Sequence, residues 1–460
     1  MVAKKQTHFE ISERKILLRI VDVLIVIFSL YISAKFFNQT YFRITDQFAN
    51  WSILLSFYLV LFGTIFEIYD LQNAESRYKV YKNITLTSCL TVLFFLFTPK
   101  YTPILPENRV QILYFFSSIL IPLIIWRTAY IYLIAAPRFY KRVLLVGDGF
   151  DVNFIKDELQ KSDPNYEVVA YINTDKDNTT ISDCKRFEIK QIESVVRRYK
   201  ISEIVVTNSF EGVSLALYQV LIPILTAGFP IRSFHQVYEE VTNKIPVENI
   251  KNDFYCYFPF SRSNQNKLYL SFVRLLDITM AVLGLAILLV LLPFILVLNL
   301  FANQGPLFYS QLRVGKDGEH FRIIKLRSMV KNAESHGAQW AIANDARVTK
   351  FGKFLRKSRL DELPQFINVL KGDMSFIGPR PERPEFVEEL AKKIPFYEIR
   401  HVVKPGLTGW AQVKAKYASS EEDSLEKLQY DLYYIKKRNV FLDLRILLKT
   451  LSTVIFFRGQ

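Results

Sequence analysis

The stretch ITMAVLGLAILLVLLPFILVLNLF occupies residues 278–301 and contains no charged side chain. An α-helix needs about 20 apolar residues to span a bilayer, so this segment belongs in a membrane. Pro293 lies inside it and Gly284 before that, and an internal proline kinks a helix. The segment can therefore cross the membrane or enter it and return to the same side, and its composition alone does not decide between the two.

Four further apolar segments precede it in the first third of the chain, each near the length of a membrane span. Pro99 and Lys100 shorten the third. Basic residues are more frequent before the first segment, after the second and after the fourth, so we expect those connections to face the cytoplasm. The four segments are residues 16–37, 51–69, 84–97 and 110–136.

The composition agrees with a membrane protein that also has soluble parts. Half of the 460 residues are hydrophobic, and 59 Lys and Arg against 44 Asp and Glu give a formal charge of +15. This excess favours an anionic partner: nucleic acid, lipid headgroups or a phosphorylated substrate. The three cysteines are isolated, which argues against a disulfide framework or a zinc site. No pattern of a nucleic-acid-binding module is present, so we expect no nucleic-acid partner.

The region after the four segments has the alternating pattern of a soluble α/β domain. Buried-strand patterns separated by helix-length segments predict a small parallel sheet, with strands at residues 143–146, 168–172 and 203–207. A glycine turn follows the first strand at Gly147, but Val152 stands where the dinucleotide-binding fingerprint has its third glycine. Asp175 is a poor candidate for the ribose-binding acid. We therefore favour a packing or regulatory role for this domain over a nucleotide site.

The strongest chemical signal is a pair of acidic residues behind a basic stretch. Residues 312–360 contain 12 Lys and Arg against 4 acids, an excess that suits several phosphates. Asp361 and Glu362 follow in LDELPQ, and because Pro364 is tolerated in the first turn of a helix, we expect both carboxylates at a helix N-terminus. That location stabilises a phosphoryl group and an ionised carboxylate. One carboxylate can accept a phosphoryl group while its neighbour binds Mg²⁺.

Two loops punctuated by glycine and proline follow the acidic pair. The first, GDMSFIGPRPE at residues 372–382, fixes Arg380 between two prolines, and the second is VKPGLTGWAQV at residues 403–413. Prolines limit backbone motion, and a guanidinium offers two parallel donors to a phosphate. The loops therefore add a rigidly held cation to the candidate site.

From about residue 267 to 460 the chain resembles the bacterial sugar transferase family, the monotopic polyprenyl-phosphate phosphoglycosyl transferases that begin exopolysaccharide and O-antigen repeat units. The matching stretches, in order, are RIIKLRSM at 322–329, NDARVT at 344–349, LDELPQ at 360–365, GPRPE at 378–382 and PGLTGWAQV at 405–413. The whole chain resembles the long members of this family.

The resemblance implies three parts: a four-span membrane α-helical bundle at residues 1–136, a Rossmann-like α/β domain at 137–262, and a mostly α-helical monotopic catalytic domain at 263–460. In that last part a re-entrant helix, residues 268–302, would be kinked at Pro293. If it re-enters, Arg274 and Asp277 lie three residues apart on one helical face, where they can pair at the headgroup level.

The resemblance also implies a covalent mechanism that uses Mg²⁺. The residue matching Asp361 attacks the β-phosphate of a UDP-sugar, UMP leaves, and the phosphosugar passes to undecaprenyl phosphate. Glu362 matches the metal-binding member of the pair.

The remaining substrate contacts implied by the resemblance are basic. Arg356 matches a phosphate-binding residue, and Lys325, Arg327 and Arg380 fall in motifs that we assign to substrate phosphates. Arg359 is a departure, since many members have Ser or Thr there, and it is expected to alter phosphate contacts or substrate preference.

Nucleotide sugars are cytoplasmic, which sets the expected orientation. We expect a multi-pass protein of the bacterial inner membrane whose Rossmann-like and catalytic domains face the cytoplasm, and this favours re-entry over crossing at residues 278–301. The family likeness suggests a homodimer. Two other functions stay open: a glycosyltransferase that releases UDP, and a membrane-anchored regulator that binds a nucleotide.

Overall fold

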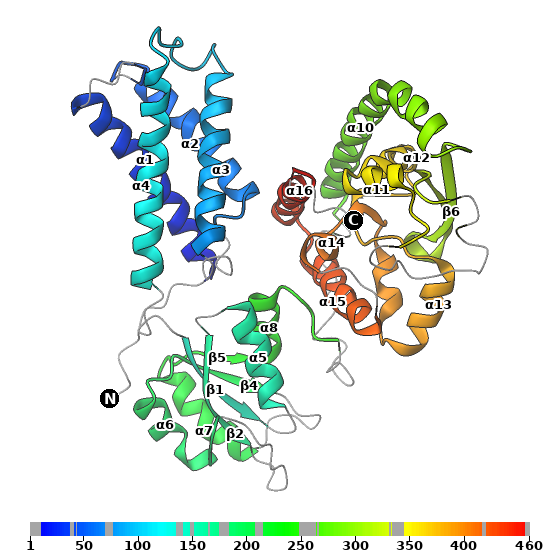
Figure 1. Ribbon diagram of the computed structural model, residues 1–460. Helices are drawn as coiled ribbons and strands as arrows, with labels where there is room; N and C mark the ends of the chain where they lie inside the picture. The colour runs from blue at the N-terminus through cyan, green and yellow to red at the C-terminus, as the bar shows by residue number, and fades with distance from the viewer. Residues whose placement is uncertain are drawn as a thin grey trace. The chain divides into compact units, whose positions relative to one another are not determined.

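The computed structural model divides the chain into two compact units, Met1–Thr242 and Asn243–Gln460, which are described separately (Figure 1). The boundaries predicted at residues 136 and 262 lie outside the described residues, so the division into three domains stays a prediction. The described residues are 11–36, 41–42, 44–69, 77–134, 141–147, 151–163, 166–173, 184–207, 215–247, 264, 266–330, 333, 345–415 and 420–455.

All four apolar segments predicted at the start of the chain form helices. They are α1 (Ile11–Phe36), α2 (Phe48–Ile65), α3 (Arg77–Leu96) and α4 (Val110–Ile134). Within α1, α2 and α4 the apolar stretches are long enough to cross a bilayer, whereas that of α3, Val80–Leu96, is shorter. With α10, described below, they identify a multi-pass membrane protein. A buried ion pair at 2.5 Å between Arg127 Nη2 and Asp22 Oδ2 joins α4 to α1.

The soluble part of the first unit is a five-stranded parallel sheet in the order β3-β2-β1-β4-β5. The three predicted strands are confirmed, and two edge strands of three residues each were missed because so short a run has no clear periodicity. The strands are β1 (Lys141–Gly147), β2 (Tyr166–Asn173), β3 (Lys185–Phe187), β4 (Glu203–Thr207) and β5 (Ile231–Ser233).

Helices cover both faces of this sheet, and alternate residues of β1 point to opposite faces. Val143 and Leu145 pack with α5 (Val152–Ser162) and α8 (Phe234–Thr242). Leu144 and Val146 pack with α6 (Ile192–Arg198) and α7 (Leu215–Thr226). The short helix η3 (Ile189–Gln191) directly precedes α6. The strand order is that of a doubly wound sheet.

The α5 N-terminus, where the fingerprint would place a pyrophosphate, is occupied by a residue of the chain itself. The Asp151 side chain accepts hydrogen bonds from the backbone N–H groups of Asn153, at 2.9 Å, and Phe154, at 3.1 Å. Residues 148–150 of the glycine turn lie outside the described part of the chain. The Asp151 cap fits the favoured packing or regulatory role of this domain.

The second unit is mostly helical, as predicted, with two small pairs of strands. The antiparallel pair is β6 (Phe308–Val314) and β7 (His320–Leu326), joined by η5 (Lys316–Gly318), and the parallel pair is β8 (Ser375–Ile377) and β9 (Gly406–Thr408). Its helices are α10 (Lys267–Ala302), α11 (Lys350–Lys357), η6 (Leu360–Gln365), α12 (Phe366–Lys371), α13 (Pro384–Lys393), η7 (Tyr397–Val402), α14 (Trp410–Lys414), α15 (Glu421–Lys437) and α16 (Val440–Ile455).

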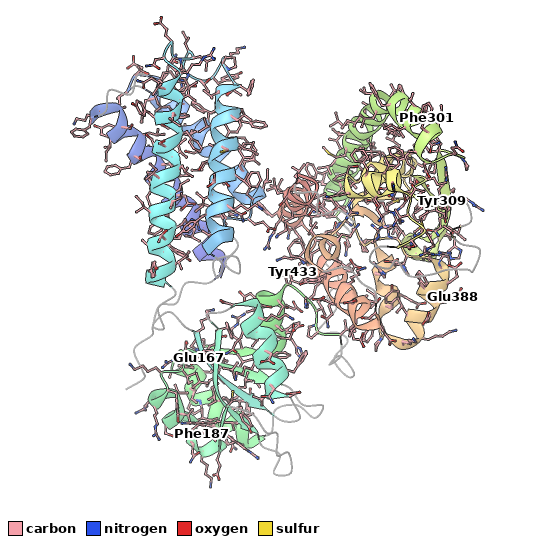
Figure 2. The ribbon with its side chains drawn as sticks, in the orientation of Figure 1. Glu167, Phe187, Phe301, Tyr309, Glu388 and Tyr433 are labelled. Atoms are coloured by element: carbon pink, nitrogen blue, oxygen red, sulfur yellow. The ribbon has the colours of Figure 1, made fainter. Side chains whose placement is uncertain are left out.

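The apolar segment at residues 278–301 lies within α10, which contains Pro293 and whose ribbon bends towards its C-terminal end (Figure 1). One face of α10 is buried on both sides of the proline: Ala281 lies in a buried cluster that includes Ile323, and Ile295 lies in one that includes Leu326. The opposite face exposes large apolar side chains, among them Phe301 near the end of the helix, which is 81% exposed (Figure 2). An apolar face of this size is suited to lipid.

The two glycine-punctuated loops predicted from the sequence meet backbone to backbone next to the β8–β9 pair. The Gly378 N–H donates to Thr408 O at 2.8 Å, and the Gly406 N–H donates to Pro379 O at 2.8 Å. A Cβ added at Gly406 would lie 2.0 Å from the Gly378 nitrogen, so only glycine allows this approach. The contact fixes the backbone that leads to Arg380.

Candidate functional site

The two acidic residues begin a helix, as the sequence predicts, but the first turns are 3-10 rather than α. Arg359 precedes η6 with φ of 59°, in the left-handed region that a non-glycine residue seldom adopts, and η6 continues directly into α12. Asp361 and Glu362 are 7% and 8% exposed. Two adjacent carboxylates are thus buried at the start of a helical segment.

Three cations surround the Glu362 carboxylate. Lys325 Nζ and Arg380 Nη2 lie 3.3 and 3.4 Å from its Oε1, and Arg359 Nη1 lies 3.2 Å from its Oε2. Burial opposes ionisation of this carboxyl, but these three positive charges outweigh burial and hold its pKa well below the usual range. Glu362 is therefore ionised at any physiological pH.

Asp361 has the opposite character. Burial and the neighbouring negative charge of Glu362 raise its pKa to about 6, against the opposing effect of Lys325, Arg356 and Arg359. Its Oδ1 atom is buried and accepts no hydrogen bond from any described residue. A carboxylate with an unpaired oxygen and a pKa just below neutrality is ionised at pH 7 and free to bond to an incoming group.

Lys325 reaches Glu362 because Asn368 fixes the strand that carries it. The Asn368 side chain accepts from the Ile324 N–H at 3.2 Å and donates to the Arg322 carbonyl at 2.8 Å. These two hydrogen bonds attach α12 to β7. Asn368 is buried. Asn368 is not among the site residues predicted from the sequence, although a single amide inside the apolar run FINVL was an available signal.

Arg356 lies near Asp361 and is held by a serine. Its Nε donates to Ser328 Oγ at 3.0 Å, and its charge acts to lower the pKa of Asp361. Together with Lys325, Arg359 and Arg380, it makes four cations around the two carboxylates. Three of the four residues assigned to substrate phosphates are thus brought to one place, and their phosphate contacts stay predictions.

Arg327, the fourth residue assigned to substrate phosphates, is engaged elsewhere. Its buried guanidinium donates to three backbone carbonyls: Pro306 O at 2.7 Å, Met329 O at 3.2 Å and Asn303 O. These bonds attach the end of α10 to the chain that follows β7. β7 ends at Leu326, so Arg327 no longer follows the strand and its guanidinium does not join those around Glu362. Its phosphate contact stays a prediction.

The predicted pairing of Arg274 with Asp277 is not what the structure shows. Arg274 Nη1 and Nη2 each donate at 2.7 Å to the last carbonyls of α12, those of Val369 and Leu370. A cation at a helix C-terminus is favourable. Asp277 Oδ1 instead accepts from Ser375 Oγ at 2.9 Å and the Phe376 N–H at 2.7 Å. The two side chains anchor α10 to neighbouring segments rather than to each other.

The donor atoms present decide which metal could bind. In the parts of the chain that the structure describes, no group of three His, Cys, Asp or Glu residues converges. Asp361 and Glu362 supply two carboxylates beside Lys325, Arg356, Arg359 and Arg380. Mg²⁺ is commonly held by one or two carboxylates plus substrate phosphates. The site therefore fits a magnesium ion shared with a phosphorylated ligand and does not fit a protein-only cage.

Known proteins are similar to parts of this chain, and the part matched by a family profile lies in the second unit. The profile of the family described as "Bacterial sugar transferase" matches residues 268–457. The "UDP-N-acetylgalactosamine-undecaprenyl-phosphate N-acetylgalactosaminephosphotransferase" of Aeromonas hydrophila is 42% identical over 230 residues, 50% of this chain and 53% of the relative. The "UDP-glucose:undecaprenyl-phosphate glucose-1-phosphate transferase" of Xanthomonas campestris pv. campestris is 44% identical over 158 residues, 34% of this chain and 32% of the relative.

A shorter relative is matched over most of its length. The "Uncharacterized sugar transferase EpsL" of Bacillus subtilis (strain 168) is 37% identical over 186 residues, which are 40% of this chain and 88% of the relative. The match to the Aeromonas protein covers about half of that protein, so it does not extend to the whole of either chain. The profile match, the near-complete coverage of the Bacillus protein and the buried acidic pair together show that this chain belongs to the bacterial sugar transferase family.

Proposed function

We propose that this chain transfers a phosphosugar from a UDP-sugar to undecaprenyl phosphate, giving UMP and an undecaprenyl-diphosphate sugar. The observation that carries the proposal is Asp361, a buried carboxylate with an unpaired oxygen beside an ionised Glu362 that three cations contact. The names of the Aeromonas and Xanthomonas relatives describe sugar-phosphate transfer to undecaprenyl phosphate, which supports this class of reaction.

The reaction takes two displacements at one phosphorus. In the first, Asp361 attacks the β-phosphorus of the UDP-sugar, the bond to the bridging oxygen breaks, and UMP leaves with that oxygen. In the second, an oxygen of undecaprenyl phosphate attacks the same phosphorus and the aspartyl oxygen leaves, which regenerates the carboxylate. Only an ionised carboxylate is a nucleophile, and a pKa of about 6 leaves Asp361 mostly ionised at pH 7.

The cations around the pair would offset the charge of the substrates. A diphosphate and a lipid phosphate bring several negative charges together, and phosphoryl transfer depends on positioning and electrostatic stabilisation of those charges. Lys325, Arg359 and Arg380 already lie within 3.4 Å of Glu362, and Arg356 acts on Asp361. An incoming diphosphate would take over part of these contacts.

Magnesium is part of the proposal. Glu362 is the carboxylate that would hold the ion, together with substrate phosphate oxygens, and the bound ion would neutralise part of the phosphate charge. The low pKa of Glu362 keeps this ligand ionised. Asp361 keeps its unpaired oxygen for the attack.

We further propose that α10 enters the membrane and returns. Thirty-six residues of straight helix would extend about 54 Å, more than the hydrocarbon core of a bilayer. Yet Ala281, before Pro293, and Ile295, after it, lie in buried clusters that also contain Ile323 and Leu326, both of the single strand β7. A helix that crossed the bilayer would separate these contacts by the membrane. The packing therefore supports a helix that lies against one side of the second unit.

Orientation follows from the substrate. A UDP-sugar is cytoplasmic, so the acidic pair and the α/β domain would face the cytoplasm from the bacterial inner membrane. The Rossmann-like designation of that domain and the homodimer suggested by the family resemblance stay predictions. Blue native electrophoresis and crosslinking of the purified chain in nanodiscs would test the dimer.

The deciding experiment measures the nucleotide product. Purified protein in nanodiscs with Mg²⁺, undecaprenyl phosphate and a panel of UDP-sugars should release UMP only when the lipid phosphate is present. Release of UDP instead would identify a glycosyltransferase that leaves the phosphate behind. Nucleotide binding that is insensitive to EDTA, without turnover, would favour the membrane-anchored regulator.

Asp361→Asn should reduce UMP release by about three orders of magnitude or more, since it removes the nucleophile at nearly constant size. A matched control is Asp317→Asn, an exposed carboxylate in the turn between β6 and β7 whose φ of 56° asparagine tolerates. Both variants should insert into membranes, and the control should retain activity. Wild-type turnover by Asp361→Asn would refute the covalent mechanism.

A further inference from the structure

A buried ion pair lies in the second unit, apart from Asp361 and Glu362. Arg400 of η7 and Asp431 of α15 are 5% and 1% exposed, and Arg400 Nη2 lies 2.7 Å from Asp431 Oδ2. Arg400 Nη1 also donates to the Tyr397 hydroxyl at 2.6 Å. A buried ion pair gains little stability over apolar packing, so its presence calls for another reason.

Arg400 makes a further hydrogen bond, to the chain segment that carries Arg380 of the candidate site. Arg400 Nη2 donates to the backbone carbonyl of Arg380 at 3.1 Å. The side chain of the same Arg380 extends to Glu362, with Nη2 at 3.4 Å from Oε1. A continuous series of contacts therefore runs from Asp431 through Arg400 and Arg380 to the carboxylate assigned to the metal.

The other side of the Arg380 loop is fixed separately. Arg313 Nη1 donates to the Pro381 carbonyl at 3.1 Å and lies 3.6 Å from Glu382 Oε2, and the Val314 N–H donates to the Glu382 carbonyl at 3.0 Å. These contacts begin after Arg380. At Arg380 itself, Arg400 contacts the carbonyl, and the prolines on either side limit how the backbone can adjust if that contact is lost.

We propose that Arg400 and Asp431 are positioning residues for the transfer reaction: Asp431 orients the Arg400 guanidinium, and Arg400 holds the Arg380 main chain so that the Arg380 side chain meets Glu362. This inference rests on the proposed function. Asp431 comes from α15 and Arg400 from η7, so the device ties the C-terminal helices to the reacting centre. A misplacement of about 1 Å at such a contact costs about 100-fold in rate.

A double-mutant cycle tests whether Asp431 acts through Arg380. With the full-length chain in nanodiscs, Asp431→Asn should lower kcat/KM for the UDP-sugar about 10- to 100-fold, and Arg380→Ala should lower it by at least as much. The double variant should resemble Arg380→Ala within about twofold, because the positioned side chain is already gone. Losses that multiply would overturn the proposal.

Two further variants separate positioning from folding. Arg400→Lys keeps the charge opposite Asp431, but a lysine cannot reach Asp431, Tyr397 and the Arg380 carbonyl together. This variant should therefore lose as much kcat/KM as Asp431→Asn, with a smaller fall in Tm than Asp431→Asn. Asp443→Asn is the matched control, since Asp443 is a buried carboxylate that accepts from Tyr269 and Tyr434 and has no contact with Arg380 among the described residues. It should lower Tm and leave kcat/KM unchanged.

Hydrogen exchange gives a readout that does not depend on the reaction. Asp431→Asn should accelerate amide exchange in peptides covering residues 376–386, and Asp443→Asn should not. Unchanged exchange in those peptides after Asp431→Asn would refute the positioning role even if activity fell. Absence of UMP release by the wild-type protein would refute the proposed function alone, because the exchange result would still decide whether Arg400 and Asp431 hold this loop.

Discussion

Gly284→Ala tests whether the close approach of α10 to the acidic pair matters for activity. A Cβ built at Gly284 would lie 2.1 Å from Phe366 Cε2, 2.2 Å from Cδ2 and 2.7 Å from Cζ. Phe366 is the first residue of α12, directly after η6, and its ring stacks on that of Phe376 at 5.9 Å. Carbon atoms in contact prefer about 3.5 Å, so the ring or the helix must move by more than about 1 Å.

The size of the effect follows from that displacement. Inserting a methyl group into a packed core costs about 1–3 kcal/mol, and a shift of about 1 Å at a reacting group costs about 100-fold in rate. We therefore expect Gly284→Ala to lower kcat/KM for UMP release about 10- to 100-fold in nanodiscs, with membrane insertion unchanged. Steady-state kinetics and thermal unfolding of the same preparation measure both quantities.

A control variant and a rescue variant accompany Gly284→Ala. Ala286→Val adds bulk two residues further along, where the residue is exposed, and should be neutral. Phe366→Leu shrinks the obstructing side chain and should restore part of the activity lost in Gly284→Ala. Full activity of Gly284→Ala, or no rescue by Phe366→Leu, would show that the contact does not control the position of the acidic pair.

Three further predictions concern the cations and the nucleophile. The kcat/KM of the wild type should rise through about pH 6 and be about tenfold lower at pH 5 than at pH 7, because the raised pKa of Asp361 leaves it protonated at the lower pH; a flat profile would contradict this. Arg359→Ser removes one of the three cations that contact Glu362. In initial-rate kinetics it should raise KM for the UDP-sugar several-fold with little change in kcat. A loss confined to kcat would instead place Arg359 in the chemical step. Arg327→Gln leaves buried backbone carbonyls without their donor and should destabilise the protein by about 1–3 kcal/mol without changing KM. Thermal unfolding and initial-rate kinetics measure these two quantities. A raised KM in a stable variant would support the phosphate-binding assignment of Arg327.

The sequence was most informative where the signal is local. Helices α1–α4 and the long α10 follow from the density of apolar residues along the chain, and β1, β2 and β4 follow from short buried runs. The start of a helix at Asp361 follows from Pro364 and its neighbours. In each case the deciding interactions lie within a few residues, so no knowledge of the fold is required.

The cations show where local reasoning stops. Lys325 and Arg327 are two residues apart in one motif, yet Lys325 contacts Glu362 while Arg327 donates to backbone carbonyls. The difference arises because β7 ends between them and the chain turns to meet the end of α10. Similarly, helical spacing places Arg274 and Asp277 on one face, but their hydrogen bonds go to other segments. Arg274 donates to a carbonyl of α12, and Asp277 accepts from the backbone of β8.

The sequence by itself determined that this chain has membrane helices, a parallel α/β domain and an acidic pair behind a basic stretch, because hydrophobic periodicity and helix-start chemistry are properties of short segments. Only the tertiary structure decided that Asn368 fixes Lys325, that Gly284 lies against Phe366 and that Asp431 connects through Arg400 to Arg380. These partners are far apart in the chain, and their contacts exist only once packing has closed the long loops between them.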